Sequence, residues 1–116
     1  MVIDDVQIEL SNNIALVRFE EGELNADLMQ EVIQLLVEQM RYNNAQHFVF
    51  DMQTITFMSS ACLGVLVQLL EDITPNRGRI AMAGCQENVE FLFKVTRLDQ
   101  VFSVHEDIEE AIREVA

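Results

Sequence analysis

The sequence predicts an α/β protein in which a mixed, partly parallel β-sheet packs against helices. Apolar residues repeat at every second position in some segments and at every third or fourth position in others. The two kinds of segment alternate along the chain in the order ββαβαβαβα. Strands separated by helices need crossover connections, so the strands after the first pair should be largely parallel. A chain of 116 residues has room for one core, and a single domain over residues 1–116 is therefore expected.

The strands differ in how their apolar residues are arranged. The first two alternate or are mostly apolar and flank the turn-forming residues Ser11-Asn12-Asn13, which indicates an antiparallel pair. The third is short, aromatic and β-branched, which is typical of a strand buried on both faces. Strands are expected over residues 6–10, 14–19, 47–52, 79–83 and 101–104.

Four segments have helical spacing. The first starts at Leu28, with Asn25 or Asp27 available as its N-cap, and ends near Arg41. The second starts at Ser59-Ser60 and keeps its apolar spacing through residue 70, before a turn signal at residues 75–78. The third covers residues 89–95. The last, over residues 108–115, is amphipathic and has carboxylates in its first turns, where they complement the helix dipole.

The charge of the chain restricts its partners. Twenty Asp and Glu residues against seven Lys and Arg residues give a formal net charge of -13, which disfavours direct binding to nucleic acid or to an anionic membrane. Hydrophobic residues make up 50% of the chain, so the charge must cover a packed core. No apolar run is long enough to span a bilayer, and Asp4 and Asp5 stand where a signal peptide would carry positive charge. A cytoplasmic protein is therefore expected.

Signatures of catalysis, metal binding and cofactor binding are missing from the sequence. The four glycines do not assemble into a phosphate-binding motif, and His47 and His105 are isolated from each other and from both cysteines. Cys62 and Cys85 lie among apolar residues, which predicts reduced, buried thiols with a structural role; a disulfide bridge between them is the minor alternative. We therefore expect no catalytic residue, no metal and no cofactor; thiol chemistry at Cys62 is the enzymatic alternative.

The most informative segment is the junction between a loop and an apolar helix at Ser59-Ser60. Backbone N–H groups at a helix N-terminus are unpaired, so a serine there commonly serves as an N-cap. A phosphate at the same position would also be favoured by the helix dipole and would add about two negative charges. The residues by themselves leave both interpretations open.

Around this junction the chain resembles the STAS domains of bacterial anti-sigma factor antagonists. The residues that carry the resemblance are a buried strand followed by an apolar pair, a serine and an apolar helix start. They are Phe48-Val49-Phe50-Asp51-Met52, Ile55, Phe57-Met58, Ser60 and Leu63-Gly64-Val65-Leu66. Further likeness at Gly22-Glu23-Leu24 and at Leu98-Asp99-Gln100-Val101-Phe102 extends it over nearly the whole chain. The resemblance implies a STAS-like sandwich, whose element order matches the one predicted above.

The resemblance also implies a mechanism and partners. An unphosphorylated antagonist binds an anti-sigma factor, often also a serine kinase of the histidine-kinase-like ATPase class, and thereby frees a sigma factor. Phosphorylation of the serine that falls on Ser60 breaks this complex, and a serine phosphatase restores it. A doubly charged phosphate in an interface costs desolvation and repels nearby carboxylates, which makes such a switch physically reasonable.

The chain departs from the family pattern at four positions close to Ser60. Asn25 and Ser59 stand where the family has aspartates, Ala61 replaces a second small or hydroxyl residue, and Cys62 replaces a glycine. With Ser60, these residues form the expected partner-binding segment, and Ser59 is an adjacent alternative phosphorylation site. The departures also favour a second interpretation, a STAS scaffold that binds other regulatory proteins without a phosphorylation switch. The sequence leaves the oligomeric state open.

Overall fold

The structure is a computed structural model that describes residues 2–3, 6–20 and 22–116. Asp4 and Asp5, which entered the prediction that no signal peptide is present, lie outside the described residues. Among the helices that are described, none is both long and apolar enough to span a membrane.

The described strands form one large and one small sheet. The large sheet has the order β1-β2-β3-β5-β7-β8, with antiparallel pairing from β1 to β3 and parallel pairing from β3 to β8. The strands β4 and β6 pair with each other in parallel and make up the small sheet. The bounds are β1 Val2–Ile3, β2 Val6–Ser11, β3 Ile14–Phe19, β4 Glu23–Leu24, β5 His47–Asp51, β6 Phe57–Met58, β7 Ile80–Ala83 and β8 Ser103–His105.

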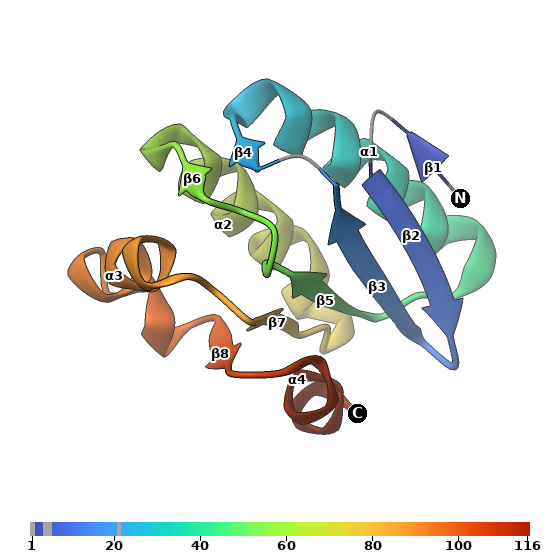
Figure 1. Ribbon diagram of the computed structural model, residues 1–116. Helices are drawn as coiled ribbons and strands as arrows, with labels where there is room; N and C mark the ends of the chain where they lie inside the picture. The colour runs from blue at the N-terminus through green and yellow to red at the C-terminus, as the bar shows by residue number, and fades with distance from the viewer. Residues whose placement is uncertain (1, 4–5, 21) are drawn as a thin grey trace.

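The helices form layers on the two faces of the large sheet. Helices α1 and α2 lie side by side on one face, α4 covers the other, and α3 lies at one end of the molecule next to β6 (Figure 1). The bounds are α1 Ala26–Asn43, α2 Ser60–Ile73, α3 Glu87–Val95 and α4 Ile108–Val115, with short 3₁₀ helices η1 at Thr74–Asn76 and η2 at Leu98–Gln100. The predicted α/β class with a partly parallel sheet is thereby confirmed.

The central strand β5 explains why the sheet needs helices on both faces. Phe48 and Phe50 are fully buried in the larger core under α1 and α2. Val49, between them, is fully buried in the smaller core under α4, where Ala81 and Ala83 of β7 also lie. Alternate side chains of a strand point to opposite faces, so a strand covered twice reads as a continuous apolar run.

The structure corrects several predicted boundaries. The last strand begins at Ser103 because Val101 and Phe102 follow η2, and the Phe102 ring packs edge-on against Phe93 with centroids 5.9 Å apart. Helix α3 begins at Glu87 and helix α1 begins at Ala26, each two residues before the expected start. The strands β1, β4 and β6 were missed, since two residues are too few to show a period.

Candidate functional site

The N-termini of α1 and α2 lie next to each other at one edge of the molecule (Figure 1). Each helix directly follows one strand of the small sheet, in which Leu24 of β4 is opposite Met58 of β6. The Ser59 N–H donates to the Leu24 carbonyl oxygen at 3.1 Å. This pairing brings together Asn25 and Ser59, the two residues that precede the helices.

Hydroxyl groups hold the loop between β5 and β6 against the segment that leads into β4. The Thr54 hydroxyl donates to the Phe19 carbonyl at 2.6 Å. The Gly22 carbonyl accepts from the Thr56 hydroxyl at 3.0 Å and from the backbone N–H groups of Thr56 and Phe57 at 2.6 and 3.1 Å. This segment lies between the strand predicted over residues 47–52 and the helix predicted from Ser59-Ser60, and no element was predicted for it. The two threonines on either side of the buried Ile55 were the available signal for these contacts.

Both helices are capped by neutral side chains. The Asn25 side-chain oxygen accepts from the Leu28 N–H at 2.8 Å, which makes Asn25 the N-cap of α1 and resolves the alternative with Asp27. Ser59 is the N-cap of α2, and its hydroxyl oxygen accepts from the Cys62 N–H at 3.4 Å. No acidic residue occupies the first turn of α2. The positive end of the α2 dipole is therefore not offset by a carboxylate in that turn.

The two adjacent serines have different surroundings. Ser59 is half-buried and engaged as the cap, whereas Ser60 is the first residue of α2 and is exposed. The Ser60 hydroxyl makes no hydrogen bond to any part of the chain that the structure describes. Ala61 is also exposed. A reagent in solution therefore reaches the Ser60 hydroxyl more readily than the Ser59 hydroxyl.

Cys62 points into the core rather than toward this surface. Its side chain is fully buried, so its predicted role in partner binding cannot be a direct side-chain contact. Both cysteines are free, as predicted, although Cys85 is only partly buried. Burial raises the pKa of the Cys62 thiol, and burial together with Glu90 raises the pKa of Cys85 to about 12. Protonated thiols are weak nucleophiles, which argues against thiol chemistry at either position.

An apolar groove runs along the seam between α1 and α2, starting at this edge. It has a volume of about 570 Å³. Its lining residues are small, apolar or neutral amides: Ala26, Gln30, Ile33, Gln34, Ala61, Gly64, Val65 and Gln68. A Cβ atom at Gly64 would meet nothing within 4 Å, so packing within the chain does not require a glycine there.

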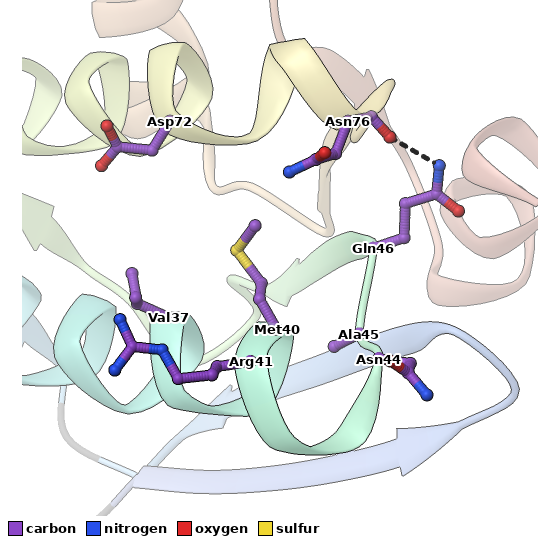
Figure 2. Close-up of a pocket in the computed structure, with 8 residues that line it drawn as sticks. All are labelled: Val37, Met40, Arg41, Asn44, Ala45, Gln46, Asp72 and Asn76. Carbon is purple, nitrogen blue, oxygen red and sulfur yellow. Dashed lines mark hydrogen bonds between the residues drawn. The ribbon is translucent and has the colours of Figure 1, made fainter.

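A second hollow lies at the opposite end of the same seam (Figure 2). It has a volume of about 610 Å³. The Met40 side chain points into it, and Arg41 and Asp72 flank it from α1 and α2 (Figure 2). Gln46 also lines it, and the Gln46 side-chain N–H donates to the Asn76 carbonyl at 2.9 Å. None of the residues predicted as functional lies in this hollow.

A third cavity, of about 500 Å³, lies at the carboxyl ends of β5, β7 and β8. It includes Cys85, Glu90 and His105, and the His105 Nε2 atom is buried without a hydrogen bond to a described residue. Within residues 2–3, 6–20 and 22–116, no group of three or more histidine, cysteine or carboxylate side chains is arranged to hold a metal ion. The arrangement around Ser60 is therefore the better candidate for function.

Comparisons with known proteins relate the whole chain to one family of domains. The family model described as the STAS domain matches residues 5–111. A Thermotoga maritima protein, provisionally assigned as an anti-sigma factor antagonist, is 29% identical over 114 residues, which cover 98% of this chain and 93% of that protein.

Solved structures show the same fold. The unphosphorylated anti-sigma factor antagonist SpoIIAA superposes with a TM-score of 0.80 at 17% identity, covering 96% of this chain and 98% of that one. The phosphorylated form of the Bacillus cell-fate determinant SpoIIAA gives a TM-score of 0.73 at 16% identity, covering 94% and 97%.

Proposed function

Since this chain belongs to the STAS domain family, we propose that it is an anti-sigma factor antagonist whose binding is switched by phosphorylation of Ser60. The observation that carries the proposal is the exposed Ser60 hydroxyl at the start of α2, beside the start of α1. The similar Thermotoga maritima protein, provisionally assigned as an antagonist, supports the same role. The partner is an anti-sigma factor or a serine kinase of the histidine-kinase-like ATPase class, and a serine phosphatase reverses the modification.

The position of Ser60 at the start of α2 supports phosphorylation there. The Ser60 side chain is exposed, so the phosphate remains in water, and the unpaired N–H groups and positive dipole of α2 favour an anion there. The caps Asn25 and Ser59 carry no charge and therefore do not repel it. Asp27 is the acidic residue in the first turn of α1.

The effect on a partner is local. One phosphate adds about -1.5 to -2 charges to a chain whose net charge is already -13. Such a small relative change in net charge cannot alter partner binding through the electrostatic field of the whole protein. It acts where the partner covers Ser60, because a doubly charged group buried in an interface loses its hydration.

The test begins with phosphorylation and then measures binding. Incubation with ATP and each candidate serine kinase of the source organism should place phosphate on Ser60, as mapped by mass spectrometry, and not on a Ser60→Ala variant. Ser60→Asp should weaken binding to the anti-sigma factor by at least about tenfold, or about 1.4 kcal/mol, whereas Ser60→Ala should bind nearly as well as the wild type.

A matched control separates position from charge. Ser11 is also exposed, at the end of β2, and Ser11→Asp adds the same charge at a different place. The affinity of Ser11→Asp for the anti-sigma factor should stay within about twofold of that of the wild type, since exposed charges beyond a Debye length are screened. Equal affinities of Ser60→Asp and Ser60→Ala would contradict the switch. Binding only to other STAS proteins would favour the scaffold interpretation, which the substituted motif at Ser59, Ala61 and Cys62 supports.

A further inference from the structure

Two of the seven phenylalanines are on the surface. Five of the rings are at most 4% exposed, whereas Phe57 is 55% exposed and Phe91 is 64% exposed. Val95, one turn after Phe91 on α3, is 57% exposed. Single exposed apolar residues are ordinary, but large apolar side chains gathered at one place commonly mark an interaction surface.

A hydrogen bond brings these residues to one side of the molecule. The Asn88 side-chain N–H donates to the Thr56 carbonyl at 2.6 Å, which fastens the first turn of α3 to β6. Residues three and four apart share a side of a helix, so Phe91 lies on the side of α3 that Asn88 turns toward β6. Phe57 is the next residue after Thr56. We call Phe57, Phe91 and Val95 the apolar edge.

The apolar edge lies beside Ser60. Phe57 belongs to β6, which ends at Met58, and only Ser59 separates that strand from the start of α2. The strand β6, the start of α2 and helix α3 occupy the same end of the molecule (Figure 1). A partner that covers Ser60 is therefore close enough to cover Phe57 and Phe91 as well.

The charges around the apolar edge indicate the chemistry of its partner. Glu23 is directly opposite Phe57 in the β4–β6 pair, and Glu87 and Glu90 lie in the first turn of α3. The cation Lys94 is paired with Glu90 at 3.2 Å, and Arg97 follows only after the end of α3. The surroundings are thus mainly acidic on a chain of net charge -13, which disfavours a second copy of this chain as the occupant.

We propose that the apolar edge is the anchoring surface for the anti-sigma factor, with Phe57 and Phe91 inserting into an apolar pocket. The basic side chains at the rim of that pocket lie opposite the carboxylates of β4 and α3 and not opposite Ser60. This inference rests on the proposed function and deepens it. Aromatic side chains carry much of the binding energy of protein interfaces, and neighbouring charges set the association rate. Ser60 is then the switch at the margin of a contact whose affinity comes from the two rings.

The experiment replaces each ring and compares it with an exposed aromatic residue elsewhere. Tyr42 is 72% exposed at the far end of α1 and provides the matched control. The probes are the purified anti-sigma factors and serine kinases of the source organism, each titrated against the wild type, Phe57→Ala, Phe91→Ala and Tyr42→Ala by calorimetry. Each phenylalanine variant should bind at least about tenfold more weakly, and Tyr42→Ala within about twofold of the wild type. All variants should keep their melting temperature, because the replaced side chains are exposed.

Further measurements identify the occupant. The association rate of the wild type should fall as salt is raised, since a basic rim meets acidic surroundings; a rate independent of salt would overturn the basic rim. A self-association detected by sedimentation and abolished by Phe91→Ala would reassign the apolar edge to a second copy. If the phenylalanine variants bind like the wild type while Ser60→Asp binds more weakly, the apolar edge does not anchor the anti-sigma factor, and the proposed function stands. If the wild type binds none of the probes, both are wrong.

Discussion

The two ends of the seam between α1 and α2 are built in different ways. Where the helices begin, the caps Asn25 and Ser59 are neutral, the groove is lined without charges, and the Ser60 hydroxyl is exposed. Where the helices end, the Gln46 side chain accepts from Asn13 at 2.9 Å and donates to the Asn76 carbonyl at 2.9 Å. We call the end where the helices begin the near end and the end where they stop the far end. At the far end, polar groups join three segments of the fold. At the near end, a hydroxyl and two aromatic rings are available to another molecule.

The largest expected contrast between the ends comes from the same substitution at two glycines. A Cβ atom at Gly78, at the far end, would lie 2.6 Å from the Gln46 carbonyl oxygen and 2.8 Å from the Ile73 Cβ atom. Gly78→Ala should therefore lower the free energy of unfolding by about 2 kcal/mol or more. Gly64→Ala, in open space within α2, should raise it by about 0.5–1 kcal/mol.

Urea unfolding followed by circular dichroism measures both glycine variants, with unchanged slopes indicating an unchanged extent of unfolding. Stability changes of opposite sign in the two variants would indicate that the groove at the near end is not required for the stability of the fold. A loss of stability in Gly64→Ala would show that the groove is closed by packing absent from this structure, and would break the comparison.

A smaller contrast comes from adding one carboxylate at either end of α1. Asn25→Asp keeps an oxygen that caps the helix and places a negative charge at its positive end. Asn44→Asp keeps a residue tolerant of the left-handed conformation, φ 59°, and places the same charge at the negative end. Asn25→Asp should raise the free energy of unfolding and Asn44→Asp should lower it, each by about 0.3–1 kcal/mol.

The two asparagine variants have equal net charge, so general repulsion cancels in the difference between their unfolding free energies. That difference should shrink when salt is raised, because exposed charges are screened. A difference of zero at low salt would mean that the helix dipole does not distinguish the two ends, and would weaken the argument that a phosphate is favoured on Ser60.

Much of the fold follows from periodicity, and the exceptions have physical causes. The run in β5 is short, aromatic and β-branched, and the run in α1 is long enough to show helical spacing, so the type and approximate bounds of both elements were correctly predicted. The strands β4 and β6 are two residues each and exist because Gly22 and Ser59 make backbone hydrogen bonds across the pair. Such a contact depends on the approach of segments more than 30 positions apart, which no local pattern encodes.

The candidate site was predictable only in part. The hydroxyl pair at the start of α2 was visible in the sequence, but the choice of cap depended on geometry, since either serine could have held that position. The exposure of Phe57 and Phe91 could not be predicted either. Phe57 belongs to a two-residue strand, and the helix predicted over residues 89–95 did not show which of its apolar side chains would be buried.

The smallest expected effect is a pH dependence of stability that belongs to the far end. His47, beside Gln46, is 7% exposed, and its Nδ1 atom accepts from the Arg79 N–H at 3.1 Å. Burial, and secondarily Arg79, lowers the pKa of His47 below its ordinary value of 6.5.

Because the folded state resists protonation of His47, the unfolded state binds the proton more readily once the pH falls below about 6.5. The free energy of unfolding should therefore decline from pH 7 to pH 5.5, where carboxylates are still mostly ionised, and level off once the folded imidazole is protonated too. His47→Asn, whose amide oxygen can accept from the Arg79 N–H, should show a flatter profile in urea titrations over the same range. His105 is common to both proteins and cancels in the comparison. Identical slopes would mean that His47 is solvated in the folded protein, and that the far end is less tightly closed than its hydrogen bonds indicate.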